Sequence, residues 1–362
     1  MRNRHLKALV PVAVLSTAGL GASIPSASAT SPHVVRPGQS IQKAVDAAAP
    51  GDTVVVQPGT YRETVLITKP GLTLRGHGDR TVIRPPDKQA PGAAADGCAK
   101  AGSGICVLGR SGRTVDNVTV DSLTVSGFRK HGVWASWTDR LSVRRVTADH
   151  NGVWGIAQER STRGSFTGNT ARANGDAGIF VANSVDEEGG ATDTRGTELR
   201  ENTLTDNRIG FTARRVRNLL VHDNTFTGNC SGVFVVGDEG KPQAGAMTIR
   251  ANRITANNKY CAKTERLPAI QGAGIVLTGT VDTQVRANTI TDNVGATPMS
   301  GGVVLFKSFV GAKNTGNTVS GNVTLGNKPA DLADGDPGKG TTGKSNTFTT
   351  NVCARSAPAG MC

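Results

Sequence analysis

The stretch Asn202-Thr-Leu-Thr-Asp-Asn207 decides the fold of this chain, because variants of it return along most of the sequence. Each variant has two asparagines five residues apart, with Thr or Arg after the first. The variants begin at Asn169, Asn202, Asn224, Asn252, Asn288, Asn317 and Asn346. A few residues beyond most of them comes a glycine and an alternating apolar segment, such as Gly232-Val-Phe-Val-Val236. Repetition of this kind indicates a solenoid, in which each unit packs on the next.

The spacing of the repeat predicts an all-β, right-handed, single-stranded parallel β-helix. The first asparagines are 33, 22, 28, 36, 29 and 29 residues apart, which fits a coil of 22 residues that sometimes carries an inserted loop. One such coil has room for three short strands and three turns. Stacking places like residues above like, so we expect ladders of asparagine side chains and strands whose Val, Ile and Leu point into the core.

The beginning of the repeat region resembles a known family. The residues from Pro50-Gly51-Asp52-Thr53 to Gly71-Leu72-Thr73-Leu74-Arg75-Gly76 are similar to the opening of pectin-lyase-like parallel β-helix proteins. The later rungs resemble repeats shared by periplasmic copper-site maturation proteins, mannuronan epimerases and other secreted proteins. The resemblance covers nearly all of the chain beyond its N-terminus. It implies the fold, and it says little about the activity.

The first 29 residues have the layout of a secretory signal peptide. Arg2, Arg4 and Lys7 precede an apolar segment over residues 8–22, and Ala27-Ser28-Ala29 is a small-residue cleavage site. The apolar segment is too short to span a membrane. The sequence therefore predicts an exported, extracellular protein without a membrane span.

Residues 30–362 are predicted to form one domain. Ser40 is a candidate N-cap for a short helix within an N-terminal cap at about 36–50, followed by coils over about 52–351. The segments Thr53–Val56, Val65–Ile67 and Leu72–Leu74 are expected to be the strands of the first coil. Residues 352–362 are predicted to be a C-terminal cap closed by a disulfide.

The six cysteines form three pairs of neighbours in sequence, Cys98 and Cys106, Cys230 and Cys261, and Cys353 and Cys362. An even number in an exported protein favours disulfides. Six cysteines allow fifteen pairings, so pairing between neighbours is a hypothesis. Zinc binding is disfavoured, because no Cys-x-x-Cys pair is present.

The chain is basic, with a formal net charge of +13, or 13 − 3 = +10 without Arg2, Arg4 and Lys7. Such a charge favours anionic partners, among which an acidic polysaccharide fits an exported protein. The alternative is that the charge only maintains solubility.

In enzymes that share this fold, the substrate groove runs along one parallel sheet, here the strands that follow the rung glycine. Alternation predicts that a largely apolar or small set of residues points outward from them: Trp134, Ser136, Ala157, Phe180, Ala182, Thr212, Arg214, Phe234, Val236, Val276, Thr278, Val304 and Phe306. The sequence lacks the Asp-Pro-His-type motif of the epimerases and the acidic clusters of the pectate lyases. Of the polygalacturonase motifs, only His131-Gly132 is matched.

The best candidate site lies where all three tryptophans fall on two successive rungs. We expect proton transfer from Glu159, Asp149 and His131, and substrate binding by Trp134, Trp137, Trp154, Lys130, Arg160 and Arg214. Aromatic rings stack on the apolar faces of sugars, and carboxylates or histidine move protons. The alternative is that the tryptophans wedge between turns and the charges are solvated.

No cofactor is expected. The loop Asp186-Glu187-Glu188 with Asp193 offers oxygen ligands of the kind that calcium uses, although a solvated acidic loop is favoured. Gly338 to Ser345 satisfies the P-loop pattern, but another rung begins at Asn346 where a helix would be required, so no nucleotide site is expected.

Three functions remain open at the level of sequence. The first is an enzyme that processes an acidic polysaccharide as a lyase, an epimerase or a hydrolase, working as a monomer. The second is a non-catalytic protein that binds extracellular glycans or has a structural role at a surface. The third is an accessory protein for metal-site assembly, which the low numbers of Met and His disfavour.

Overall fold

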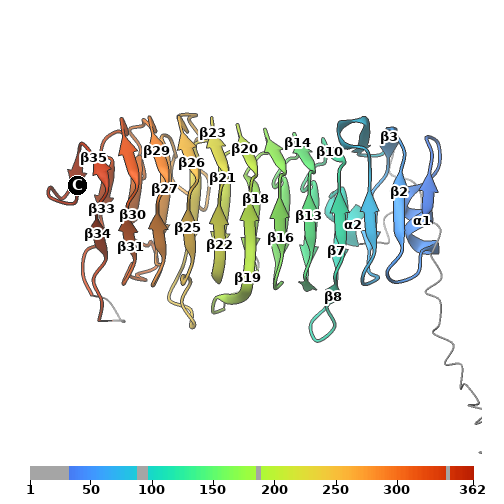
Figure 1. Ribbon diagram of the computed structural model, residues 1–362, viewed down its shortest axis with the longest axis horizontal. Coiled ribbons are helices and arrows are strands. Elements are labelled where there is room, and N and C mark those ends of the chain that lie inside the picture. The colour runs from blue at the N-terminus through green and yellow to red at the C-terminus, as the bar shows by residue number, and fades with distance from the viewer. Residues whose placement is uncertain (1–31, 88–96, 185–188, 340–342) are drawn as a thin grey trace, which may run out of the picture. The chain divides into compact units, whose positions relative to one another are not determined.

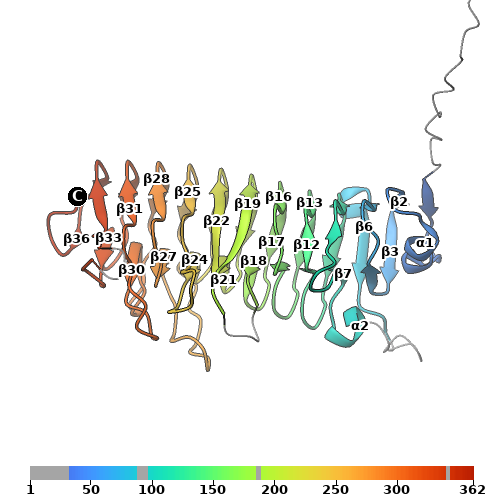
Figure 2. The ribbon, with the colours of Figure 1, turned by 90° about the horizontal axis from the view of Figure 1, so that it is seen from below.

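The computed structural model describes residues 32–87, 97–184, 189–339 and 343–362. Within Pro32–Cys362 the chain winds through successive coils that stack side by side, as Figure 1 shows. Each coil contributes one strand to each of three parallel sheets, which we name A, B and C. Seen from below, in Figure 2, the coils keep the same order along the stack. The predicted parallel β-helix is therefore confirmed.

Sheet A has 12 strands: β1 (His33–Val35), β2 (Thr53–Val56), β5 (Thr73–Arg75), β9 (Thr119–Asp121), β13 (Ser142–Arg144), β16 (Ser165–Thr167), β19 (Thr192–Arg200), β22 (Val216–His222), β25 (Thr248–Arg250), β28 (Gln284–Arg286), β31 (Thr318–Ser320) and β34 (Thr347–Thr349). Sheet B has 11 strands: β3 (Gly59–Arg62), β6 (Thr81–Arg84), β10 (Thr124–Ser126), β14 (Thr147–Asp149), β17 (Thr170–Arg172), β20 (Thr203–Thr205), β23 (Thr225–Thr227), β26 (Arg253–Thr255), β29 (Thr289–Thr291), β32 (Val323–Leu325) and β35 (Val352–Cys353).

Sheet C also has 11 strands: β4 (Val65–Ile67), β7 (Ile105–Leu108), β11 (Val133–Ser136), β15 (Ile156–Glu159), β18 (Ala177–Ala182), β21 (Ile209–Arg214), β24 (Ser231–Val236), β27 (Ala273–Thr278), β30 (Gly301–Phe306), β33 (Leu332–Asp334) and β36 (Ser356–Ala357). A small two-stranded sheet joins β8 (Val115–Asp116) to β12 (Thr138–Asp139). The helices are α1 (Ile41–Ala47), α2 (Gly97–Ala101) and the 3-10 turn η1 (Gly78–Arg80).

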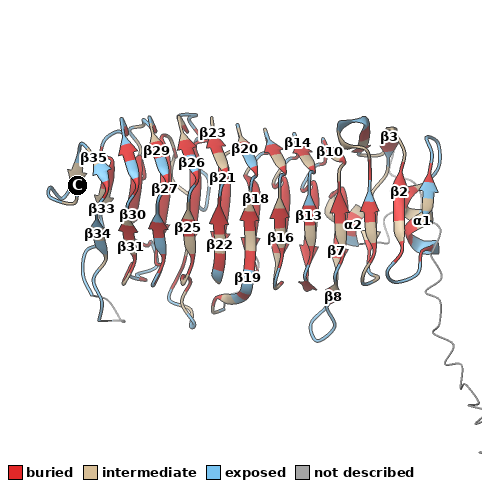
Figure 3. Ribbon diagram, viewed as in Figure 1, coloured by how far each residue is buried: buried red, intermediate tan, exposed pale blue. Residues whose placement is uncertain are grey.

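The core lies inside the coils and is built in columns of apolar side chains. In sheet A, the middle residue of each three-residue strand after β1 points inward, and the register places Phe166 between Val143 and Leu199. All three of these side chains are fully buried. Figure 3 shows buried residues in the strands of successive coils along the stack. Narrow coils therefore bury their apolar residues by contact with the coils on either side.

Two continuous ladders of asparagine side chains run along the corners of the coils. In the ladder between sheets A and B, the amide of Asn202 donates to the side-chain oxygen of Asn224 at 2.8 Å, and that of Asn224 donates to Asn252 at 2.9 Å. A second ladder between sheets B and C links Asn207 to Asn229 in the same way. Each of these side chains is at most 2% exposed. The ladders satisfy buried polar groups that would otherwise destabilise the turns.

The last two sequence repeats occupy a different corner from the one expected. Asn317 does not continue the ladder of Asn288, whose amide donates instead to Asn322 at 2.9 Å. Asn317 donates to Asn346 at a third corner, just before sheet A. The motifs that begin at Asn317 and Asn346 therefore enclose the sheet A strands β31 and β34, whereas the earlier motifs enclose strands of sheet B.

The N-terminal coil also differs in detail from the prediction. Helix α1 begins after its N-cap Ser40, as expected, and buries Ile41 and Val45. The carboxylate of Glu63 accepts from the backbone N–H of Ile41 at 2.7 Å and satisfies the start of this helix. However, β3 was not predicted, and β5 pairs with β2, so the Leu72–Leu74 segment belongs to the second coil. The small residues Gly59 and Thr60 in β3 explain why this strand gives no apolar signal.

The six cysteines form three disulfides in the structure: Cys98–Cys106, Cys230–Cys261 and Cys353–Cys362. At the C-terminus, β35 and β36 pair within sheets B and C, so the last coil extends beyond residue 351. The helices among the described residues lack the length and apolar character that crossing a membrane requires.

Candidate functional site

The outward face of sheet C carries the side chains that alternation predicted. The register places Trp134, Ala157, Phe180, Thr212, Phe234 and Val276 in one row across successive strands. A neighbouring row contains Ser136, Glu159, Ala182, Arg214, Val236 and Thr278. The apolar members of these rows form clusters of their own outside the main core. Sheet C therefore has a second apolar layer on its outer side.

A stack of three rings begins this layer. His131 lies 4.3 Å from Trp154 between ring centroids, and Trp154 lies 4.0 Å from Phe180, with interplanar angles of 12° and 7°. All three residues are buried. Because both faces of the Trp154 ring are covered, this tryptophan cannot offer a face to a sugar. The structure thus argues against Trp154 as a stacking platform and leaves its edge toward the adjoining cleft.

His131 is poorly suited to proton transfer. Burial, assisted by the positive charge of the exposed Lys130, lowers the pKa of His131 to about 3. Its Nδ1 atom has no hydrogen-bond partner among the described residues. The ring is therefore neutral near pH 7 and acts as an apolar plate in the stack.

The other predicted residues of the first rungs pair with one another. The indole N–H of Trp134 donates to a carboxylate oxygen of Glu159 at 2.8 Å. The guanidinium of Arg160 lies 5.6 Å from the ring centre of Trp137 and donates to the hydroxyl of Ser184 at 2.7 Å. Glu159, Trp134, Trp137 and Arg160 thus lie together at one edge of sheet C.

Asp149 is not part of this group. It lies on β14 of sheet B, where its carboxylate accepts from Arg172 at 3.0 Å and contacts His150 at 2.7 Å. Asp149 is close to the tryptophans in sequence, which suggested that they belong together. However, the three strands of one coil belong to three different sheets, which lie on different sides of the solenoid. We therefore do not retain Asp149 in the site.

A cleft of about 460 Å³ lies next to the ring stack, over the middle strands of sheet C. Trp154 and Phe180 border it at one end, and Thr212 and Phe234 belong to its floor. One wall consists of Arg266 and Leu267, and another consists of Ser308, Phe309 and Val310. The side chain of Phe309 is 66% exposed. The cleft is therefore apolar at its base and has loops on both sides of the strands.

Asp176 is the carboxylic acid at the end of this cleft nearest the ring stack. It precedes β18, and its carboxylate accepts from the indole N–H of Trp154 at 3.1 Å. Burial raises the pKa of Asp176, although the Trp154 hydrogen bond and the positive charges of Arg208 and Arg266 oppose this shift. A carboxyl group with a raised pKa can hold a proton closer to neutral pH than an exposed aspartate does.

Arginine side chains line the far side of the cleft. Arg214, one of the predicted binding residues, lies at the end of β21 and donates to the backbone oxygen of Ser184 at 2.5 Å. Arg215 is buried and forms an ion pair with Asp238, which also borders the cleft. The site thus combines an acid, guanidinium groups and an apolar floor.

Sequence reasoning missed Asp176 and Arg266. Asp176 follows Asn174-Gly175, one rung after Trp154, so the rung alignment offered a signal for it. Arg266 lies on an inserted loop, which the 36-residue spacing from Asn252 to Asn288 indicates without showing where the loop folds.

The remaining sequence hypotheses concern ions and nucleotides. Asp186, Glu187 and Glu188 of the proposed calcium loop lie outside the described residues, as does the predicted signal peptide. The pKa of Asp193 is lowered, first by a hydrogen bond with Asn218. In the part of the chain that the structure describes, no group of three His, Cys, Asp or Glu side chains is arranged to hold a metal ion. Residues Thr347–Thr349 form strand β34, in a position where the P-loop pattern requires a helix.

A family comparison agrees with the coil architecture. The family described as "Right handed beta helix region" matches residues 97–245 and 185–322. The chain belongs to this right-handed β-helix family. A comparison with curated proteins gives no match.

Several solved structures share the fold of this β-helix protein. The A-module of the mannuronan C-5 epimerase AlgE4 from Azotobacter vinelandii superposes with a TM-score of 0.59 at 20% identity, covering 86% of this chain and 89% of that one. A DFA-IIIase from Arthrobacter chlorophenolicus A6, without its lid and in complex with GF2, also gives 0.59, at 14% identity and 89% coverage of each chain. The Dettilon tailspike protein gives 0.54 at 12% identity, covering 88% of this chain and 61% of that one. At these identities, the likeness concerns the fold alone.

Proposed function

We propose that this protein is exported, binds an acidic polysaccharide in the cleft over sheet C, and processes it with Asp176 as the proton-transfer group. The observation that carries the proposal is the position of Asp176, a carboxyl group with a raised pKa at the end of a cleft with guanidinium groups along its sides. Two of the solved structures with this fold are named as an epimerase of mannuronan and as a DFA-IIIase, which supports a carbohydrate as the ligand.

The chemistry of the cleft suits a chain of acidic sugars. The apolar face of a sugar ring can lie on the exposed Phe309, and the guanidinium of Arg214 offers donors to a sugar carboxylate. Elimination, epimerisation and hydrolysis each require a proton to be moved at a sugar carbon or a glycosidic oxygen. A protonated Asp176 donates such a proton, and the ionised form accepts one.

A second candidate function is binding without catalysis. It is favoured by Asp238, the other acidic residue that borders the cleft among the described residues, because Arg215 neutralises its charge through a buried ion pair. Enzymes that hydrolyse glycosides mostly use two carboxyl groups, so a single available acid is compatible with a site that only holds its ligand. We do not propose a role in metal-site assembly.

The test is to incubate the purified protein with acidic polysaccharides and their carboxyl-reduced, neutral derivatives, with and without calcium. Absorbance of unsaturated uronates reports elimination, release of reducing ends reports hydrolysis, and uptake of solvent deuterium at the sugar carbons reports epimerisation. Activity in any channel that Asp176→Asn abolishes without loss of binding supports the enzyme. Binding that is silent in all three channels supports the non-catalytic alternative, and absence of binding to every polymer would refute both.

A further inference from the structure

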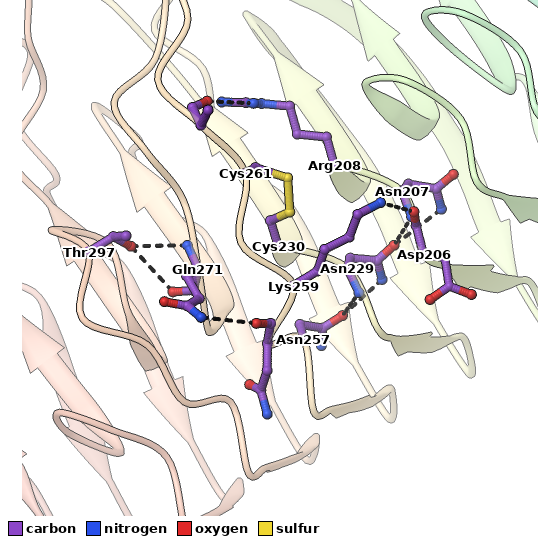
Figure 4. The surroundings of a disulfide bond; sticks show 12 residues. Asp206, Asn207, Arg208, Asn229, Cys230, Asn257, Lys259, Cys261, Gln271 and Thr297 are labelled. Atoms are coloured by element: carbon purple, nitrogen blue, oxygen red, sulfur yellow. Dashed lines mark hydrogen bonds between the residues drawn. A yellow bond between two sulfur atoms is a disulfide. The ribbon is translucent and has the colours of Figure 1, made fainter.

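The segment of residues 258–270, which we name the strap, is an insertion between β26 and β27 that is fastened to neighbouring coils. Cys261 on the strap is joined by a disulfide to Cys230, which precedes β24. The backbone oxygen of Ala262 accepts from the Arg208 guanidinium at 2.9 Å, and the Lys259 ammonium donates to the backbone oxygen of Asp206 at 2.6 Å. Figure 4 shows the disulfide, Arg208 and Lys259 as anchors between the strap and earlier coils.

Beyond these anchors the strap forms a narrow hairpin. The backbone groups of Cys261 and Ile270 exchange two hydrogen bonds, at 2.9 and 3.0 Å. At the tip, the N–H of Thr264 donates to the oxygen of Leu267 at 2.9 Å, and the N–H of Leu267 donates to the Thr264 hydroxyl at 3.1 Å. The hairpin therefore holds Arg266 in a tight turn, although its side chain is exposed.

The tip reaches back along the stack to the cleft. Arg266 lines the same cleft as Trp154 and Asp176, which belong to coils well before the one from which the strap emerges. The charge of Arg266 acts on the carboxyl group of Asp176, which also indicates proximity. Lys263, at the start of the tip, is exposed as well but is not among the residues that line the cleft.

From this arrangement we infer that the strap is a substrate-binding element, in which Arg266 recognises the carboxylate of an acidic sugar at the Asp176 end of the cleft. The inference rests on the proposed function and adds the group that selects charged over neutral sugars. A guanidinium matches a carboxylate with two parallel hydrogen bonds. The disulfide and the Arg208 anchor fix the strap before binding, so less conformational entropy is lost when the sugar binds.

The test compares four proteins by their dissociation constants for a carboxylated polysaccharide and for its carboxyl-reduced derivative. They are the wild type, Arg266→Gln, the matched control Lys263→Gln and the double variant Cys230→Ala/Cys261→Ala. Arg266→Gln should weaken binding of the carboxylated polymer about tenfold or more, in line with the strength of hydrogen bonds between charged groups, and leave the neutral polymer unaffected. Lys263→Gln removes the same charge from the same hairpin and should change either constant less than twofold, which is about the effect of an exposed charge.

The double variant should retain its far-ultraviolet circular dichroism, because the asparagine ladders of the coils do not depend on this disulfide. Its preference for the carboxylated polymer should nevertheless fall by about as much as that of Arg266→Gln. Equal effects of Arg266→Gln and Lys263→Gln, or a folded double variant with unchanged preference, would overturn the inference while the proposed function stands. If the wild type binds neither polymer, the proposed function and the inference both fail.

Discussion

Asp176 and His131 precede strands of sheet C that are two rungs apart, with Trp154 on the rung between them, and burial moves their pKa values in opposite directions. Desolvation penalises the charged form in both cases, so it raises the pKa of the acid and lowers that of the base. Trp154 joins the two, since its ring stacks on His131 while its indole N–H donates to Asp176. The sequence correctly predicted that the tryptophans lie on two successive rungs. His131 and Asp149 were predicted to transfer protons only because they are close to the tryptophans in sequence. Whether such a residue can transfer a proton in the cleft depends on the burial of its side chain and on the face of the coil that it occupies. Proximity along the sequence shows neither.

Replacing Asp176 by asparagine should abolish the activity proposed above and slightly raise stability at neutral pH. The raised pKa means that the folded state favours the protonated carboxyl, so its contribution to stability is complete below the unfolded pKa and is lost as the pH rises through the folded value. Asparagine keeps an acceptor for the Trp154 indole but carries no charge at any pH. Denaturant unfolding at pH 5 and pH 8 checks this prediction, and a variant less stable than the wild type at pH 8 would contradict it.

Replacing His131 by phenylalanine should make the protein less sensitive to acid. Because the folded-state pKa is lowered from 6.5 to about 3, the neutral ring stabilises the folded state fully above about pH 6.5, and this contribution is lost as the pH falls toward 3. Phenylalanine preserves the stack with Trp154 and does not titrate. The measurement is the free energy of unfolding of both proteins between pH 7 and pH 4. Parallel curves would show that His131 does not cause the acid sensitivity.

At the scale of the elements, the asparagines of the repeated hexapeptide lie at the turns where the chain passes from one sheet to the next. The residue before a ladder asparagine often has a positive φ, as in Asp206 at 59° and Asp223 at 55°, and the asparagine then bonds to its counterpart in the next coil. Corners before and after the strands of sheet B use the same chemistry, and a third corner uses it near the C-terminus. The motif alone therefore does not identify its corner, and the repeats at Asn317 and Asn346 do not stack on the earlier ones although their sequences match.

Replacing Asn224 by alanine should destabilise the protein by about 3 kcal/mol, because it leaves buried backbone and asparagine groups without partners on both sides. The side chain of Asn224 is 1% exposed and donates to Asn252, to Leu199 and to His222. The neighbouring Thr225→Ala is the control, since this side chain points outward from sheet B and should change the free energy of unfolding by less than about 0.5 kcal/mol. An equal decrease in the free energy of unfolding for the two variants would show that the side-chain hydrogen bonds of the ladder contribute little to stability.

At the scale of the whole molecule, the architecture could be predicted from the sequence because successive coils repeat the same pattern of short strands and turns. A misplaced motif or an unpredicted strand, such as β3, changes the register of one segment without changing the stack. The site was harder to predict, because it depends on inserted segments that leave the repeat. The strap that carries Arg266 and the loop that carries Phe309 contain no repeat signal, and they fold back over coils that are distant in sequence. The periodicity of the sequence therefore predicts the coils of a solenoid, whereas its binding surface depends on inserted segments that do not follow the repeat.

The same stacking predicts that stability is graded along the molecule. A middle coil has a neighbour on each side, and its core residue Phe226 is fully buried. In the terminal coil, Phe348 is only partly buried and Val352 is 56% exposed.

In an array whose units contact only their neighbours, opening the end breaks one interface, whereas opening the middle breaks two. Amide hydrogen exchange should therefore be slowest in β21 to β27 and fastest in β34 to β36, where the Cys353–Cys362 disulfide limits the opening. Uniform protection from β21 to β36 would mean instead that the coils open as a single cooperative unit.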